Sequence, residues 1–219
     1  MKNNFHDKRG AFMESFQITD NFFESLENEI SSLNQQLFNS LKGKDNFLCS
    51  VEFIKITFSE NLLNDVKFLN TLSGEPLFKA RYANIILRDM LEQVIEFIFL
   101  MKHKELLPDY MGFNVDTSKL TTHNPIKVIH KLGRKRYSGG RKSVSEMADD
   151  INEKKSFQNG TSLYELYELL SEESHNSYFF ANMDGIEQVA TGEKVLALTE
   201  DQAHYLVLIV AYFMKVYRQ

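Results

Sequence analysis

Four polar side chains late in the chain recur about one helical turn apart and fall within roughly one 60° arc of a helix: Tyr164, Glu168, Ser171 and His175. A histidine with a near-neutral pKa can act as a general acid or base, so this stripe has the residue types of a catalytic surface. The leucines of the same stretch occupy the opposite side and are predicted to face the core: Leu163, Leu166, Leu169 and Leu170. A hydrogen-bonded core histidine is the competing interpretation.

A second candidate group is a charged pair, Arg88 and Glu92, which lie one helical turn apart in the segment "RYANIILRDMLEQVIEFIFLMKH". Large apolar residues flank both charges, and a separate polar stripe of Asp89, Gln93 and Glu96 is predicted to face solvent. One interpretation is a surface ion pair worth a few tenths of a kcal/mol. The other is a functional arginine, because a guanidinium can hold a phosphate through two parallel hydrogen bonds.

Metal-independent RNA cleavage needs a base for the 2′-hydroxyl, an acid for the leaving oxygen and positive charge beside the phosphorus. Arg88, Glu92 and His175 could fill these roles if their two helices face each other. The same residues could instead form a buried polar network that fixes the register of the helices, in a non-catalytic interaction module. Binding of a nucleotide or another small ligand in the same polar cleft is a third hypothesis.

The segment "KLGRKRYSGGRK" carries six Lys or Arg residues and no acid, in a chain whose net charge is −5. A local cluster of cations can neutralise nucleic-acid phosphates, and a tyrosine within it can stack on a base. The candidate nucleic-acid-binding residues are Lys131, Arg134, Lys135, Arg136, Tyr137, Arg141 and Lys142. A solvated loop is the alternative.

Apolar residues at steps of three and four predict long helices over 21–41, 46–72 and 76–103, and a further helix from Thr199 to the end of the chain. Capping-box spacing at Ser143/Glu146 and at Ser162/Glu165 predicts two more helix starts. We therefore expect an all-α bundle of long antiparallel helices.

The organisation predicted around these helices is a single domain with three less regular parts. Few prolines (3) and glycines (10) disfavour an all-β fold. We expect a helical domain over 19–219 with a flexible N-terminal arm at 1–18, a long loop region at 104–142 holding a short helix at 125–132, and one short β-hairpin near 186–198.

Composition also indicates a compartment and argues against some kinds of site. Cys49 is the only cysteine, which excludes an intramolecular disulfide and a cysteine-built zinc site and favours the cytoplasm. The longest apolar run, 205–214, is too short to span a bilayer, so no membrane association is expected. His103, His123 and His130 lack metal-site spacing and no glycine-rich phosphate loop occurs, so we predict neither a metal nor a cofactor.

The Arg-x-x-x-Glu helix, followed by a helix with the pattern Tyr-x-x-Leu-Ser-x-x-x-His, resembles a group of bacterial helical proteins similar to the HEPN (higher eukaryotes and prokaryotes nucleotide-binding) superfamily. The resemblance covers roughly 81–177. It implies a helical bundle, often a homodimer, with members that are metal-independent ribonucleases in antiphage defence and toxin–antitoxin systems. RNA and an antitoxin protein are the implied partners.

The resemblance carries over His175 and Arg88 as catalytic residues, with Glu92 and Ser171 as orienting partners. HEPN ribonucleases have an arginine on the histidine helix itself, and the matching positions here are Leu170, Leu169 and Glu168. Arg88 would have to replace that arginine from the neighbouring helix, or the chain has the fold without the cleavage chemistry.

Overall fold

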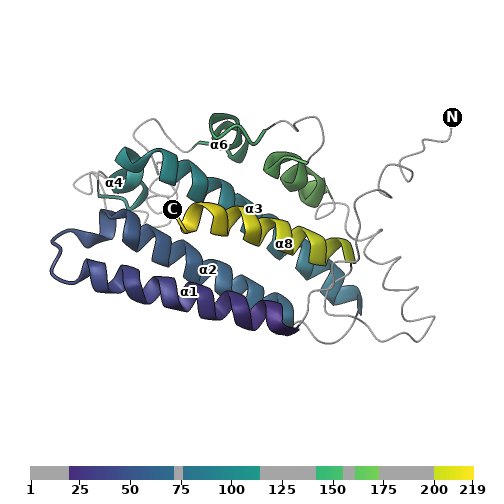
Figure 1. The fold of residues 1–219 in the computed structure, drawn as a ribbon. Coiled ribbons are helices and arrows are strands. Elements are labelled where there is room, and N and C mark those ends of the chain that lie inside the picture. The colour runs from purple at the N-terminus through teal and green to yellow at the C-terminus, as the bar shows by residue number, and fades with distance from the viewer. Residues whose placement is uncertain (1–19, 72–75, 114–141, 155–160, 173–199) are drawn as a thin grey trace, which may run out of the picture.

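The computed structural model describes residues 20–71, 76–113, 142–154, 161–172 and 200–219, and all regular structure within these ranges is helical (Figure 1). The prediction of an all-α fold is confirmed for this part of the chain. Three predicted features lie outside it: the arm at 1–18, the short helix at 125–132 and the hairpin near 186–198.

Four long helices lie side by side and form the bundle: α1 (Asp20–Leu41), α2 (Val51–Thr71), α3 (Pro76–Lys102) and α8 (Glu200–Tyr217). The pair α1 and α2 is an antiparallel hairpin, and α3 runs back along α2 (Figure 1). Gly43, with a φ of 79°, supplies the left-handed turn that ends α1, a conformation that glycine adopts without strain.

The helix α3 lies at the centre of the described bundle, because α2, α6 (Val144–Asp150) and α8 all pack against it. Its side chains are accordingly buried around most of its circumference, including Leu87, Met90, Leu91, Val94, Ile95, Phe97, Phe99 and Leu100. A helix that is apolar on nearly every side needs cover on nearly every side, and this explains its central place.

The helix α8 runs parallel to α3, which departs from the predicted antiparallel arrangement. Near the start of both helices, Gln202 Nε2 donates a buried hydrogen bond of 2.8 Å to Asn84 Oδ1. Further along both, the rings of Phe97 and Phe213 lie 4.7 Å apart. Short connections force neighbouring helices to be antiparallel, whereas residues 103–199 give the chain enough length to return to the starting end.

The second helix begins later than predicted. Asn46 adopts a left-handed conformation, and Phe47–Cys49 form a single 3₁₀ turn, η2. Ser50 is extended and its Oγ accepts a 3.2 Å hydrogen bond from the Phe53 backbone N–H. Ser50 is therefore the residue that caps α2, and the apolar periodicity before it continues through a turn rather than a helix.

Both predicted capping boxes are confirmed. The Ser143 N–H donates to Glu146 Oε2 at 2.7 Å, and the Glu146 N–H donates back to Ser143 Oγ at 3.2 Å. The same two bonds join Ser162 and Glu165, at 3.0 and 3.1 Å, and open the helix at 163–172. Each pair satisfies N–H groups that the first turn of a helix leaves free.

The region predicted as a long loop, 104–142, begins with helical turns that pack on the core. A 3₁₀ turn η3 (Lys104–Leu106) leads into α4 (Leu107–Tyr110). Leu107 is buried, and the Tyr110 ring lies 5.9 Å from that of Phe58 on α2. The described start of this region is therefore part of the folded core.

A buried polar network joins α1, α2 and α8 at Asn34. Its Oδ1 accepts hydrogen bonds from Ser59 Oγ at 3.0 Å and from Tyr217 Oη at 2.5 Å. Its Nδ2 donates to Glu60 Oε1 at 2.7 Å. Because one amide satisfies groups from two other helices, it fixes how the three helices align.

Asn34→Ala is expected to lower the free energy of unfolding by about 2–3 kcal/mol, because it leaves the buried Tyr217 hydroxyl without its acceptor. Urea unfolding monitored by circular dichroism would measure this. Asn39→Ala, at an exposed position of the same helix, is the matched control and should change stability by less than about 0.5 kcal/mol. Equal losses in the two variants would contradict the role given to Asn34.

The polar stripe of α3 contacts α2 instead of solvent alone. Gln93 Nε2 donates to Asp89 Oδ2 on its own helix at 2.9 Å and to Asp65 Oδ2 on α2 at 3.2 Å. Glu96, predicted to face solvent, is 9% exposed. Burial, together with the nearby Asp89 carboxylate, raises the pKa of Asp65 to about 6.

Asp65→Asn is expected to stabilise the protein above pH 6 by on the order of 1 kcal/mol, and by less near pH 4. A carboxyl with a raised pKa in the folded state binds its proton more tightly there than in the unfolded chain. Its contribution to stability therefore falls as the pH rises from about 4 to 6, and the neutral amide of the variant lacks this penalty.

The check is the unfolding free energy of wild type, Asp65→Asn and the exposed control Asp149→Asn at pH 4.5 and 7.5. If Asp65→Asn and Asp149→Asn show the same pH dependence, the assignment of the raised pKa to Asp65 is wrong.

Candidate functional site

A cleft of about 480 Å³ lies between α3, the first turn of α6 and the helix at 163–172. Its volume is within the range of ordinary ligand sites. Polar and aromatic side chains from all three elements line it, including Glu92, Lys142, Ser143, Glu146, Tyr164 and Tyr167. Three residues singled out in the sequence, Glu92, Lys142 and Tyr164, are therefore brought together here.

Arg88 lies one helical turn before Glu92 and faces the helix at 163–172. Its guanidinium carbon is 5.6 Å from the ring centroid of Tyr167, which lines the cleft. Its Nε is buried and has no hydrogen-bond partner in the described part of the chain. The ion pair that the spacing allowed between Arg88 and Glu92 is not formed, so among the described residues the guanidinium has an aromatic neighbour and no anionic one.

The two tyrosines of the cleft extend this cation–aromatic contact. The rings of Tyr164 and Tyr167 are stacked, with centroids 6.0 Å apart and planes 24° apart. Arg88, Tyr167 and Tyr164 therefore form a ladder that runs from α3 to the cleft. A guanidinium over a tyrosine ring contributes about 0.5–2 kcal/mol, more where the pair is shielded from water.

Lys142 is the last residue of the predicted basic segment and the only one in the described part of the chain. The other residues of the segment, 131–141, lie outside it. The Lys142 Nζ lies 5.1 Å from the ring centroid of Phe99 on α3. Near it, hydrogen bonds from the Ser143 backbone and hydroxyl lower the pKa of Glu146 and keep that carboxyl ionised. In the described part of the chain, the charged residues that line the cleft are thus Lys142, Glu146 and Glu92.

The predicted polar stripe of the later helix is described as far as Glu172, so His175 lies outside the described residues. Ser171 is half-buried, and its Oγ is buried without a hydrogen-bond partner among the described residues. Glu168 is exposed. Leu163, Leu166 and Leu170 are buried as predicted, whereas Leu169 is 37% exposed.

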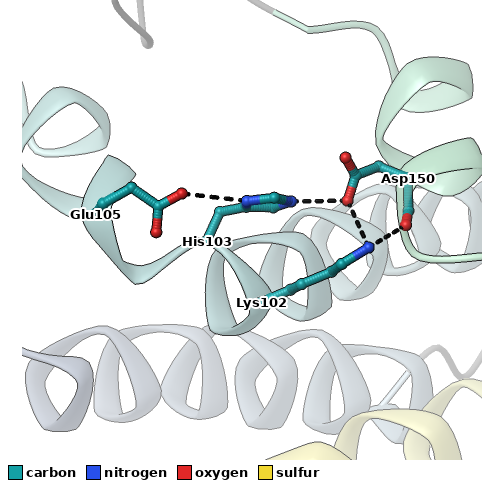
Figure 2. Close-up of polar contacts among 4 residues, drawn as sticks. All are labelled: Lys102, His103, Glu105 and Asp150. Carbon is teal, nitrogen blue, oxygen red and sulfur yellow. Dashed lines mark hydrogen bonds and ion pairs between the residues drawn. The ribbon is translucent and has the colours of Figure 1, made fainter.

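Two features of this surface were not predicted from the sequence. Tyr167 receives the Arg88 guanidinium, although the two positions are 79 residues apart and no local pattern joins them. His103, considered in the sequence only as a metal ligand, is hydrogen-bonded to Asp150 at the end of α6, where Lys102 and Glu105 also lie (Figure 2).

Within the described residues, no group of three or more His, Cys, Asp or Glu side chains is arranged to hold a metal ion. None of the described helices is long and apolar enough to cross a membrane.

Comparison of the chain with models of known protein families, with curated proteins and with solved structures gives no match.

Arg88→Met is expected to leave the free energy of unfolding unchanged or to raise it by up to about 1 kcal/mol. Methionine loses the cation–aromatic contact with Tyr167, but this loss is offset because it keeps an apolar side chain there and removes a partly desolvated charge that has no anionic partner among the described residues. Chemical denaturation would test this beside Arg218→Met, where the Glu29 ion pair at 2.6 Å is lost. A loss above about 1.5 kcal/mol for Arg88→Met would show that Arg88 is needed for folding instead of for a ligand.

Proposed function

We propose that this protein binds single-stranded RNA in the cleft between α3, α6 and the helix at 163–172. The observation that carries the proposal is Arg88, a partly buried guanidinium that lies over the ring of Tyr167 and has no anionic partner among the described residues. An RNA phosphate is a natural partner for such a group, because it accepts two parallel hydrogen bonds from the guanidinium fork.

Tyr164 supports a single strand over a duplex. It forms the cleft end of the ladder that Arg88 and Tyr167 begin, and a base stacked on its ring would extend that ladder. Duplex RNA offers its backbone and minor groove but keeps its bases paired and stacked. Lys142, at the rim, would hold a neighbouring phosphate, and the basic segment that precedes it would follow the strand.

We further propose, from the resemblance to HEPN proteins, that the protein is a cytoplasmic, dimeric helical bundle. It would act on RNA as a stress or antiphage effector, with an antitoxin as a partner. The helical bundle and the placement of Arg88 against the helix that bears Ser171 support the fold and the RNA site of this proposal. The compartment, the dimer, the effector role and the antitoxin are predictions from the sequence. Cleavage remains a prediction from the sequence, with His175 as the acid or base and Glu92 and Ser171 orienting it.

The alternative of a purely structural Arg/Glu/His network has less support. A buried network stabilises a fold only when its polar groups are mutually satisfied. Arg88 forms neither an ion pair nor a hydrogen bond with Glu92, and its Nε is unsatisfied within the described residues. Arg88 therefore contributes little to holding the described helices together through polar contacts.

The test is fluorescence anisotropy of a labelled single-stranded RNA pool at several salt concentrations. Wild type is expected to bind, and Arg88→Met to weaken binding about tenfold and to reduce the log–log salt slope by about 0.7, the loss of one phosphate contact. Lys67→Met is the matched control: Lys67 is an exposed α2 cation paired with Glu27. Removing it costs the same charge away from the cleft and should change neither quantity.

If Arg88→Met and Lys67→Met weaken RNA binding equally, the loss comes from the lower net positive charge alone. That result would contradict the cleft as the binding site. No binding by wild type at low salt would refute RNA as the ligand. The same samples, incubated in EDTA with unlabelled RNA beside a folded His175→Ala variant, report cleavage. If Arg88→Met and His175→Ala lose cleavage while wild type and Lys67→Met keep it, the proposed function extends to that of a ribonuclease.

A further inference from the structure

The rim of the cleft depends on α6, a helix of seven residues. A helix this short is not stable by itself and keeps its place through tertiary contacts. Met147 and Ala148 are its buried residues, and both belong to the core that α3 centres. The other attachment of α6 is polar and lies at its last residue, Asp150.

Asp150 is held by Lys102, the last residue of α3, and by His103, which follows it (Figure 2). His103 Nε2 lies 2.7 Å from Asp150 Oδ1, and Lys102 Nζ lies 2.9 Å from the same oxygen. Lys102 also donates to the Asp150 backbone carbonyl. Hydrogen bonds from His103 and Lys102 lower the pKa of Asp150, so the carboxylate is ionised at neutral pH.

The second ring nitrogen of His103 also faces a carboxylate. Its Nδ1 lies 3.2 Å from Glu105 Oε1, whose side chain is 70% exposed. A neutral imidazole has one donor and one acceptor nitrogen, whereas an imidazolium has two donors. Both contacts can be hydrogen bonds only when His103 carries two protons. In the neutral ring, one nitrogen lone pair would face a carboxylate oxygen.

One aromatic ring joins this cluster to the cleft. The His103 ring lies 4.7 Å from that of Phe99, one turn earlier on α3. The ammonium of Lys142 lies 5.1 Å from the centroid of the same Phe99 ring and also lines the cleft. The segment 142–150 is thus fastened to the last two turns of α3 at both of its ends.

We infer that His103 is a proton-dependent positioning residue, which in its protonated form clamps Asp150 and so holds α6 and the Lys142 rim of the cleft against α3. Loss of the proton leaves one N–H for two carboxylates and removes the ion pair between His103 and Asp150, which loosens α6. Lys102 on α3, Asp150 on α6, Glu105 on η3 and Lys142 before α6 are the charged groups around it among the described residues. The consequence for ligand binding rests on the proposed function, but the clamp itself does not.

The direction of the pH dependence follows from these charges. Both carboxylate contacts need the doubly protonated ring, so the attachment of α6 is expected to weaken as the pH rises and this proton is lost. It also weakens in strong acid, where Asp150 is protonated. The attachment of α6 therefore has an optimum between these two limits.

The experiment is amide hydrogen exchange of the peptide covering 142–154 in the full chain, at pH 6 and pH 8, corrected for intrinsic exchange and compared with α1. In wild type, protection of this peptide relative to α1 should fall about tenfold from pH 6 to pH 8, because the His103–Asp150 ion pair is lost. His103→Gln, which carries no charge, should show the lower protection of wild type at pH 8 at both pH values. His103→Arg, which is always charged and donates from both edges, should be protected at both.

His204→Gln, at an exposed position of α8, is the matched histidine control and should behave as wild type. Protection of 142–154 that changes with pH no more than that of α1 would overturn the inference, and so would His103→Arg behaving as His103→Gln. RNA affinity measured at the same pH values separates the two proposals. A pH-dependent α6 without RNA binding keeps the clamp and refutes the RNA function, whereas RNA binding with a pH-independent α6 refutes the clamp alone.

Discussion

The need to cover α3 on nearly every side is the constraint on which the rest of the structure depends. Its buried side chains point in all directions, and no single neighbouring helix can shield them all. α2 and α8 cover two sides as long helices, and the remaining side is covered by α6 together with the helix at 163–172. Removing any of these covers would expose large apolar side chains to water.

The cleft lies where this last side is covered by two separate helical segments in place of one continuous helix. Each separate segment has its own N-terminal end, which brings polar capping groups with it. The capping box of α6, Ser143 and Glu146, lies in the cleft wall for this reason. A polar hollow next to an apolar helix is thus a geometrical result of covering α3 in pieces.

The sequence predicted what depends on local spacing. The first and third helices begin and end close to the predicted residues, and both capping boxes form, because caps and apolar periodicity act over a few residues. The predictions were wrong where contacts between distant segments determine whether a residue is buried. Leu169 follows the leucine pattern but is exposed, Glu96 follows the polar pattern but is buried, and the polar stripe of α3 contacts Asp65 on α2.

The residues of the candidate site also fall into those that the sequence could predict and those that it could not. Arg88 and Glu92 could be chosen from their unusual apolar flanks, and Lys142 from the basic segment. Their neighbours could not, because Tyr167 and the Asp150 partner of His103 are distant in the chain and follow no periodicity. The parallel course of α8 was equally hidden, since it depends on the path of a long connection.

The electrostatics of the cleft favour recognition of a specific anion over general attraction. The chain as a whole carries a charge of −5, and Glu92 and Glu146 lie in the cleft wall beside Lys142. The described wall of the cleft therefore gives little long-range attraction of its own, and binding to it depends on short-range contacts. Arg88 provides such a contact: its charge is shielded from water by Tyr167 and is not cancelled by Glu92. A phosphate that reached it would gain a bidentate partner without breaking an Arg88–Glu92 ion pair first, so the absence of that pair is itself a form of preorganisation.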